Sequence, residues 1–247
     1  FTPDTNALLG EVPEVKNFFV CCGLNSVGIG TGGGVGKITA EWLMTGHINE
    51  DIFSYDIKRF QKFHSELGFI KKRITESLGD LYGMHWPFKQ HKTSRNIKTL
   101  PHHDNLKSFG ACFGVSGGYE RPMWFALDGE RTEYEYSYNY QNWYPSAEYE
   151  TNNTIKNVGL FDLTPFSKFE IKSNKAHKEL QKICTANVKN EPGKCVYTQM
   201  LNTDGGIETD LTVVCIEKDY FRIISSATTR ERDKFHIRKH LSKDIEI

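Results

Sequence analysis

A glycine-rich run near the start of the chain is the segment whose residue types most directly permit ligand chemistry. Its glycines are Gly23, Gly28, Gly30, Gly32, Gly33, Gly34 and Gly36. Glycine lets a ligand approach the backbone closely, and the free N–H groups at the start of a following helix favour an anionic or electron-rich group. The run therefore indicates a binding loop, and tight packing between a strand and a helix is the alternative interpretation.

Two nucleotide-binding motifs can be compared with this run. The Walker A pattern fails, because Thr31 stands at its first glycine and Ile38 replaces the hydroxyl residue that would hold magnesium. The dinucleotide pattern G-x-G-x-x-G matches at Gly28, Gly30 and Gly33. Chance matches are expected in so glycine-rich a run, and the sequence that follows is charged and lacks a further βαβ pattern. Neither motif is adopted.

Elements of regular structure must position this run. Residues 17–22 are apolar and predict a short buried strand, and the loop over residues 24–37 follows it. Val35, Ile38 and Trp42 are spaced i, i+3 and i+7, which predicts a helix that ends near Gly46.

Helical and strand patterns alternate through the rest of the chain. Helical spacing spans residues 56–81, with its basic residues expected on a solvated face. Patterns further on predict strands over 158–163 and 166–171 around a turn, a helix over 177–183, strands over 195–201 and 207–216 joined by a hairpin turn, and a strand over 221–225. Thr228 and Glu231 have capping-box spacing before a last helix. The fold class is α+β or α/β.

The charge balance limits the partners of the chain. Lys and Arg number 31, as do Asp and Glu, so the formal net charge of the 247 residues is zero. A broad basic surface is excluded, and no apolar run is long enough for a membrane span. We therefore expect neither a nucleic-acid partner nor a membrane partner.

Cysteine and histidine spacing does not indicate a metal centre. The six cysteines form no C-x-x-C pair, and His102-His103-Asp104 is the nearest approach to a ligand cluster. Cys21, Cys22 and Cys215 lie in apolar runs, which favours reduced thiols in the core. We expect no metal site.

Several long motifs resemble the dimethylglycine and sarcosine dehydrogenase family. F-T-P-D-T-N-A-L-L-G-E, F-F-V-C-C-G-L-N-S-V-G-I-G-T-G-G-G-V-G-K, A-E-W-L-x-x-G and D-I-x-R-F are similar to the C-terminal end of its flavin-binding domain. G-Y-E-R-P-x-W-F resembles the junction before its folate-binding domain. V-G-L-F-D-L-T-P-F-S-K-F-E-I, V-Y-T-Q-M-L-N-T-D-G-G-I-E-T-D-L-T-V and F-R-I-I-S-S-A-T-T-R-E-R-D resemble the first part of the aminomethyltransferase (glycine-cleavage T-protein) fold.

The resemblance implies a piece of a longer chain that spans a domain junction. Residues 1–60 would end an FAD-dependent, D-amino-acid-oxidase-like oxidoreductase domain, residues 61–115 would form a central linking domain, and residues 116–247 would begin an aminomethyltransferase-type folate-binding domain. This organisation agrees with the α+β or α/β class predicted from the sequence pattern, and it assigns the helices and strands to three successive segments.

The same resemblance implies a function and its partners. The whole protein would use FAD to demethylate an N-methyl amine, either dimethylglycine or sarcosine, and would pass the one-carbon unit to tetrahydrofolate. Electron-transfer flavoprotein or oxygen would accept the electrons. The enzyme would be cytoplasmic in a bacterium and would lie in the mitochondrial matrix in a eukaryote. The alternative is a non-catalytic regulatory relative similar to the pyruvate dehydrogenase phosphatase regulatory subunit.

Site residues follow from matching positions in the family motifs. The flavin contacts would be Leu24, Asn25, Ser26, Val27, Gly28, Ile29 and Gly30. On the folate side, Asp210 would handle the proton of the folate amine, and Tyr197, Phe166 and Ser226 would contact folate. The family motif often has two adjacent acids, and Thr209 replaces the first of them here. The catalytic assignment therefore stays open between Asp210 and a neighbour, and a strand-edge carboxylate in a turn network is the structural alternative for Asp210.

Overall fold

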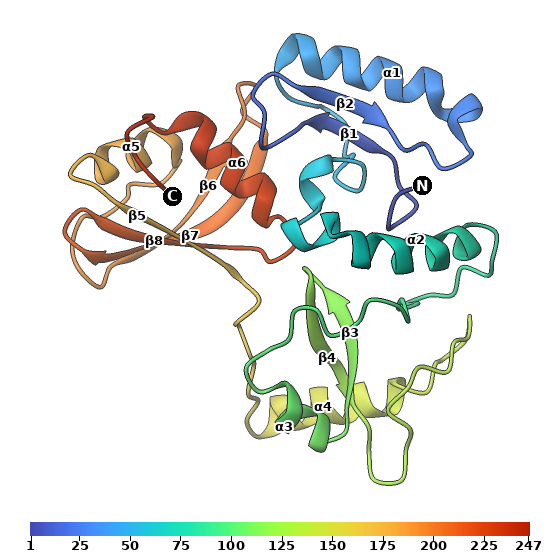
Figure 1. The fold of residues 1–247 in the computed structure, drawn as a ribbon. Helices are drawn as coiled ribbons and strands as arrows, with labels where there is room; N and C mark the ends of the chain where they lie inside the picture. The colour runs from blue at the N-terminus through green and yellow to red at the C-terminus, as the bar shows by residue number, and fades with distance from the viewer. The chain divides into compact units, whose positions relative to one another are not determined.

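The computed structural model describes residues 1–247, and contacts within the chain divide them into two units (Figure 1). The first unit combines residues 1–64 with residues 166–247, and the second unit consists of residues 65–165. Helices and antiparallel sheets occur in both units, which confirms the mixed helix and sheet content predicted.

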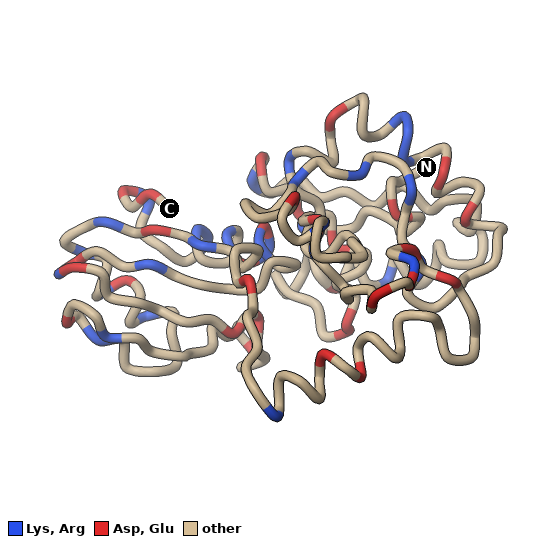
Figure 2. The backbone as a smooth tube through the Cα atoms, turned by 90° about the horizontal axis from the view of Figure 1, so that it is seen from below, with Lys and Arg blue, Asp and Glu red and all other residues tan.

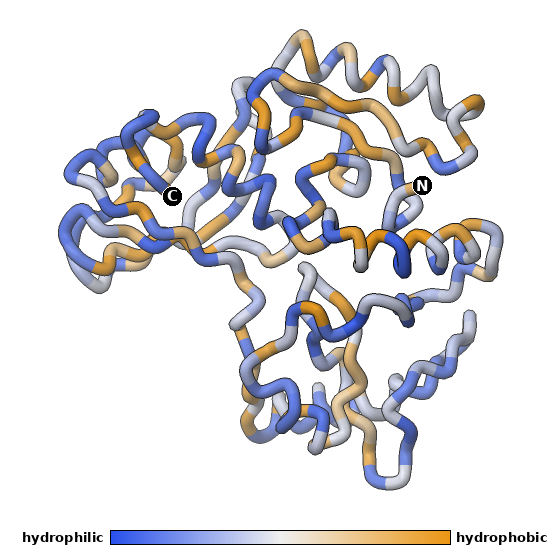
Figure 3. Tube along the Cα trace, viewed as in Figure 1, coloured by the Kyte–Doolittle hydropathy of each residue, from blue (hydrophilic) through white to orange (hydrophobic).

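A hairpin and a long helix form the N-terminal part of the first unit. Strands β1 (Leu8–Glu11) and β2 (Phe19–Cys22) pair antiparallel, and Figure 3 shows them as largely hydrophobic. Helix α1 (Gly28–Thr45) packs on them through Trp42, whose ring meets that of Phe19 edge-on at 6.0 Å. The helix ends at Gly46 in a left-handed conformation, as the glycine stop signal predicts.

The glycine run is helical from Gly28 onward, which corrects the predicted loop over residues 24–37. A Cβ atom added at any glycine from Gly30 to Gly36 would meet nothing within 4 Å, so packing within the chain does not require these glycines. Each costs about 1 kcal/mol in helix propensity. The helix forms regardless because its apolar face is buried on the hairpin around Trp42.

Residues 56–81 form three separate helical pieces, where the sequence pattern predicts one helix. The pieces are η1 (Ile57–Arg59), η2 (Lys62–Ser65) and α2 (Leu67–Leu81). Extended backbone at Phe60 and Glu66 separates them. The interruption lets Lys58 point inward, where it is 4% exposed and lies 3.0 Å from Asp56 Oδ1. Pairing of the buried ammonium with a carboxylate offsets its desolvation, and the predicted solvated basic face is wrong at this position.

A four-stranded antiparallel sheet forms the rest of the first unit, in the order β5-β8-β7-β6. Its strands are β5 (Ser167–Lys172), β6 (Cys195–Leu201), β7 (Ile207–Glu217) and β8 (Tyr220–Ser225). Helices α5 (Ala176–Ile183) and α6 (Arg230–His240) contribute Leu180 and Ile237 to the core beside this sheet. Alternate strand residues such as Leu211 and Phe221 complete that core, and the intervening residues form the outer face.

Two local predictions in this part of the chain are wrong. Residues 158–163 form no strand, although β5 follows the predicted turn. The capping box between Thr228 and Glu231 does not form, because α6 begins at Arg230 with Thr229 as its N-cap. Thr229 Oγ1 instead donates to Asp233 Oδ2 at 2.7 Å, within the first turns of the helix.

The second unit contains three helices and a two-stranded sheet. They are α2, α3 (His103–Ser108), α4 (Tyr144–Lys156), β3 (Ala111–Ser116) and β4 (Tyr119–Phe125).

An ion pair joins Arg95 to the buried carboxylate of Glu120 in this unit. Arg95 Nε donates to Glu120 Oε1 at 2.7 Å, and Arg95 Nη2 donates to Glu120 Oε2 at 2.5 Å. Burial alone would raise the pKa of Glu120, but hydrogen bonds from Arg95 and Asn96 and the charge of Arg95 leave that pKa below its ordinary value.

Cysteine burial follows the tertiary structure more than the local apolar pattern. All six cysteines are free, and Cys112, Cys184 and Cys215 are buried. Burial raises the pKa of Cys112 and of Cys184 to about 11. Cys21 and Cys22 are exposed on β2, so the prediction that they lie in the core is wrong.

Residues of both charge signs are interspersed along the backbone, as Figure 2 shows. None of the helices combines the length and the hydrophobicity that crossing a membrane requires.

Candidate cofactor and substrate sites

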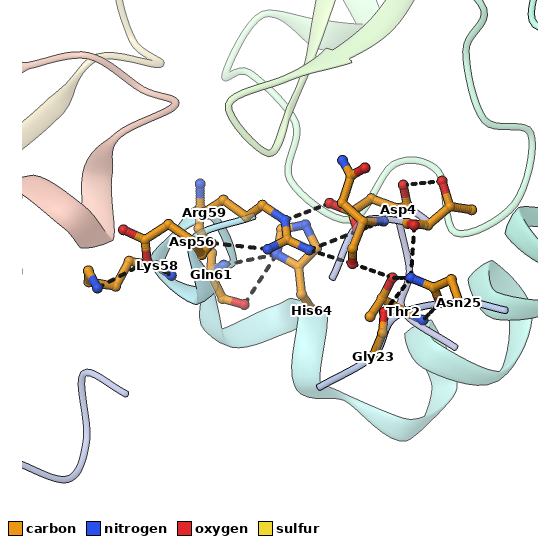
Figure 4. Close-up of polar contacts among 11 residues, drawn as sticks. Thr2, Asp4, Gly23, Asn25, Asp56, Lys58, Arg59, Gln61 and His64 are labelled. Atoms are coloured by element: carbon orange, nitrogen blue, oxygen red, sulfur yellow. Dashed lines mark hydrogen bonds and ion pairs between the residues drawn. The ribbon is translucent and has the colours of Figure 1, made fainter. Parts of the chain in front are cut away.

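Asn25 holds the loop between β2 and α1 through its side-chain amide, which is almost fully buried. Its Oδ1 accepts a hydrogen bond from the Thr2 backbone N–H at 2.9 Å. Its Nδ2 lies 3.0 Å from Thr2 Oγ1, 2.8 Å from the Thr5 carbonyl oxygen and 2.6 Å from the Gly23 carbonyl oxygen (Figure 4). Because the chain itself uses both ends of the amide, this side chain acts as an internal clamp.

The same loop presents its outer surface at the start of α1. Asn25 and Ser26 both have positive φ, 46° and 71°, and this reversal turns the chain from the strand into the helix. Ser26, Val27, Ile29 and Gly30 are exposed, and no side chain caps the first turn. The first N–H groups of an α-helix have no partner within the helix, so an electron-rich group can bind here.

The seven residues matched to flavin contacts therefore fall into two groups. Leu24 packs against the hairpin core and Asn25 clamps the loop. The other five, from Ser26 to Gly30, form the turn and the first helical residues. Sequence matching alone does not distinguish the residues that hold the loop from those that line its surface.

Arg59 braces the segment that Asn25 clamps, and its side chain is largely buried there, so the expected solvated position is wrong for this residue as well. Its guanidinium binds Asp4 in a bidentate manner, with Nε 2.7 Å from Oδ2 and Nη2 3.0 Å from Oδ1 (Figure 4). Nη2 also donates to the Asn6 carbonyl oxygen at 3.1 Å. Such charge-assisted pairs are among the strongest hydrogen bonds in proteins. The D-I-x-R-F motif contains this arginine and is the signal that could have identified it.

Asp210 and Tyr197 meet on the outer face of the four-stranded sheet. Tyr197 Oη donates a hydrogen bond to Asp210 Oδ2 at 3.0 Å, and the tyrosine side chain is largely exposed. Asp210 lies on the inner strand β7, directly opposite Gln199 on β6. Its side-chain partner is therefore on a neighbouring strand, whereas the turn-network alternative would pair it within the hairpin turn.

Phe166 and Ser226 lie at the ends of the two remaining strands. Ser167 pairs with Ser225, and Ser167 Oγ donates to the Ser226 carbonyl oxygen at 2.9 Å. The β7–β8 register, continued two residues beyond Ile224, brings Ser226 opposite Asp210. The register thus places Asp210, Phe166 and Ser226 at one end of the sheet, and Tyr197, two residues further in on β6, reaches Asp210 through its hydroxyl.

A polar cavity of about 350 Å³ lies elsewhere in the first unit and was not predicted. At its wall, His47 Nε2 is 2.7 Å from Asp204 Oδ2, and Arg232 Nη2 is 2.9 Å from Glu208 Oε2. Burial lowers the pKa of His236, which also lines the cavity, to about 4. The first contact joins the segment after α1 to the turn between β6 and β7, and the second joins α6 to β7.

Comparison with protein families accounts for most of the chain. The family described as "GCVT N-terminal domain" matches residues 102–247. The chain belongs to this family. The family described as "FAD dependent oxidoreductase central domain" matches residues 45–99. An FAD-oxidoreductase central domain followed by a GCVT domain is the order that the sequence motifs predict.

Curated relatives resemble the chain over most of its length. A 4-methylaminobutanoate oxidase (formaldehyde-forming) of Paenarthrobacter nicotinovorans is 38% identical over 97% of the chain and 29% of its own length. A mouse mitochondrial pyruvate dehydrogenase phosphatase regulatory subunit is 32% identical over 100% of the chain and 29% of its own length. Human mitochondrial sarcosine dehydrogenase is 34% identical over 86% of the chain and 26% of its own length. The chain thus spans less than a third of each relative.

The family assignment can be mapped onto the elements of the fold. The GCVT span contains α3, β3, β4 and α4 and continues through the sheet that carries Asp210 and Tyr197. The FAD-oxidoreductase span contains η1, η2 and α2. The loop clamped by Asn25 and the glycine-rich part of α1 precede both spans.

Proposed function

We propose that the chain is part of an enzyme that uses FAD and tetrahydrofolate to demethylate an N-methyl amine, dimethylglycine or sarcosine. The observation that carries this proposal is the succession of an FAD-oxidoreductase central domain and a GCVT domain in one chain. Relatives named as an oxidase of 4-methylaminobutanoate and as a dehydrogenase of sarcosine support it. In this proposal residues 1–60 form the C-terminal part of the flavin domain. Residues 61–115 form a central domain that links it to the folate domain, whose N-terminal part is residues 116–247.

The loop before α1 is the flavin-facing segment in this proposal. Its fit rests on an uncapped helix start and on the open space around Gly30, where a Cβ atom would meet nothing within 4 Å. Bound FAD would accept the hydride of the amine. Ser26, Val27, Gly28, Ile29 and Gly30 would contact the flavin, with the helix N–H groups favouring electron density on the ring. Leu24 and Asn25 would position them.

The outer face of the sheet is the folate-facing surface. Tetrahydrofolate would supply the amine that captures the one-carbon unit. Asp210 would accept a proton from that amine, and the hydrogen bond from Tyr197 Oη would orient its carboxylate. The Phe166 ring is 41% exposed and can offer an aromatic face, and the Ser226 hydroxyl lies at the same end of the sheet.

The remaining partners follow from the same proposal. Electrons would leave to an electron-transfer flavoprotein or to oxygen, and neither nucleic acid nor a membrane would take part. The enzyme would be cytoplasmic in a bacterium and would lie in the mitochondrial matrix in a eukaryote, consistent with relatives from both settings.

The test is reduction of the flavin in the whole protein under anaerobic conditions. Dimethylglycine, sarcosine and 4-methylaminobutanoate are added in turn, and the loss of oxidised-flavin absorbance is followed. We expect at least one of the first two amines to reduce the flavin. Adding tetrahydrofolate should then shift the product from formaldehyde to methylenetetrahydrofolate. The proposal fails if neither dimethylglycine nor sarcosine reduces a correctly loaded flavin, and reduction by 4-methylaminobutanoate alone would replace the proposed substrate.

A regulatory role is the second candidate, because the phosphatase regulatory subunit aligns with 100% of this chain at 32% identity. A protein of that kind would bind a phosphatase without oxidising amines. Absence of flavin reduction together with stable binding to a pyruvate dehydrogenase phosphatase would favour it. Flavin reduction without phosphatase binding would exclude it.

A further inference from the structure

Three side chains of the second unit converge beside α2. Glu76 and Asp80 are one helical turn apart, so their carboxylates lie on the same face of the helix. The segment after the helix returns His91 to this face, with Nδ1 3.9 Å from Glu76 Oε1 and 3.8 Å from Asp80 Oδ2. One ligand atom from each residue lies within 4.8 Å of the others. Sequence spacing does not reveal this group, because fifteen positions separate Glu76 from His91.

The carboxylates of this group are held in place by neighbouring donors. Glu76 accepts hydrogen bonds from the Lys92 N–H at 2.6 Å, from the Thr93 N–H at 2.9 Å and from Thr93 Oγ1. Lys89 Nζ lies 2.6 Å from Asp80 Oδ1, which leaves Oδ2 directed toward His91. Ligands fixed by such outer contacts are oriented before an ion binds.

The ionisation state of Glu76 suits a ligand. Burial alone would raise its pKa, but the hydrogen bonds from Thr93 and Lys92 leave that pKa below the ordinary value. Its side chain is 15% exposed, against 29% for Asp80 and 34% for His91. The group is therefore partly shielded and still open to solvent on the histidine side.

The ligand set selects the kind of ion. Lys89 on Asp80 and Arg73, with Nε 3.9 Å from Glu76 Oε2, balance the two carboxylate charges. A hard ion such as Ca²⁺ or Mg²⁺, which depends on many oxygen ligands, gains little here. One imidazole nitrogen with two carboxylate oxygens suits Zn²⁺ in a site that leaves the fourth position to water. Bonds of about 2.1 Å to zinc require His91 Nδ1 to move about half an ångström closer to each of the two carboxylate oxygens, which lie 3.9 and 3.8 Å away.

We propose that Glu76, Asp80 and His91 bind one Zn²⁺ ion, which ties the segment after α2 back onto the helix. The fourth ligand is water. The proposal concerns the second unit alone and is independent of the flavin and folate chemistry proposed above.

Titration calorimetry with Zn²⁺ on the chelator-treated whole protein tests this proposal. His91→Ala should weaken the site at least tenfold, because it removes the only nitrogen ligand. His85→Ala is the matched control, since His85 is exposed on the same segment and lies outside the cluster. It should bind one Zn²⁺ as the wild type does. Asp80→Asn should also weaken binding.

A second measurement separates this site from other zinc ligands in the chain. Zn²⁺ should raise the melting temperature of the wild type and of His85→Ala, and it should leave that of His91→Ala unchanged. Both variants are first checked for native circular dichroism. Unchanged zinc affinity in His91→Ala would overturn the proposal. So would zinc binding that disappears only when the exposed thiols Cys21 and Cys22 are replaced by serine.

Discussion

Individual side chains in this protein often serve the fold at positions where motif matching suggests a ligand contact. Asn25 lies within the flavin-matched run, yet its amide is committed to Thr2, Thr5 and Gly23. Asp210 differs, because its carboxylate is exposed and meets one tyrosine hydroxyl. Partner count and burial therefore separate a positioning residue from a candidate catalytic one.

Replacing Asn25 with alanine should destabilise the first unit. The buried Thr2 N–H and the Gly23 carbonyl would lose their partner, which costs about 1–3 kcal/mol in the free energy of unfolding. Urea unfolding of the whole protein measures this change. Ser26→Ala, at the exposed neighbouring position, should change stability by less than about 0.5 kcal/mol. Equal urea midpoints of unfolding for the two variants would contradict the stabilising role assigned to the Asn25 side chain.

Replacing Asp210 with asparagine should separate the two half-reactions. Amine-dependent flavin reduction should persist, whereas formation of methylenetetrahydrofolate should fall by about 10²-fold or more, because a proton acceptor is lost. Product analysis with and without tetrahydrofolate measures this. Glu170→Gln is the control, since Glu170 is an exposed carboxylate on β5 of the same sheet. A similar loss in both variants would remove Asp210 from its assigned role.

At the scale of elements, the hairpin and α1 depend on one close approach. Gly10 in β1 has φ of 108°, and a Cβ atom there would lie 2.3 Å from Trp42 Cη2. Packing of the hairpin against α1 therefore requires a glycine at position 10, outside the glycine-rich run that the sequence makes conspicuous. The glycines from Gly30 to Gly36 face open space, so no packing within this chain requires them.

Alanine substitutions at two glycines should therefore have opposite effects. Gly10→Ala should destabilise by about 2 kcal/mol or more, since it combines an unfavourable φ with a clash against a buried ring. Gly36→Ala should stabilise by about 0.5–1 kcal/mol through helix propensity. Chemical denaturation followed by tryptophan fluorescence measures both. A neutral Gly10→Ala would show that Trp42 repacks without cost.

At the scale of the whole molecule, buried ionisable groups link stability to pH. Burial lowers the pKa of His236 to about 4, and the charge of His240 acts in the same direction. The unfolded chain retains a histidine pKa near 6.5, so it binds the proton first as the pH falls. Folding stability is therefore unaffected by His236 above about pH 6.5 and decreases between pH 6.5 and pH 4.

The pH effect can be isolated by substitution. Between pH 7 and pH 5 this histidine should account for a loss of about 2 kcal/mol in the free energy of unfolding. His236→Gln should lose less stability than the wild type over that interval, as measured by urea unfolding at each pH. His85→Gln, at an exposed position, should follow the wild type. Parallel pH profiles for wild type and His236→Gln would contradict this origin.

Local patterns in the sequence suffice where neighbours along the chain determine the structure. Alternation predicts the strand over residues 195–201 and its return after the Asn202–Gly206 turn, because strand pairing across a short turn is a local event. Long motifs identify the family in the same way, since they need only linear order. The Gly46 stop signal also holds, because a left-handed residue ends a helix locally.

Tertiary structure decides what depends on partners that are distant in the sequence. The helical glycines of α1, the burial of Lys58 and the clamp by Asn25 arise from contacts with the hairpin, Asp56 and Thr2. The cluster at Glu76 likewise requires a later segment to return to α2. Periodicity indicates which face of a helix or strand is apolar, but it does not indicate which polar groups folding brings together. For that reason the sequence by itself determined the family and the order of its parts, and only the folded chain assigned roles to individual side chains.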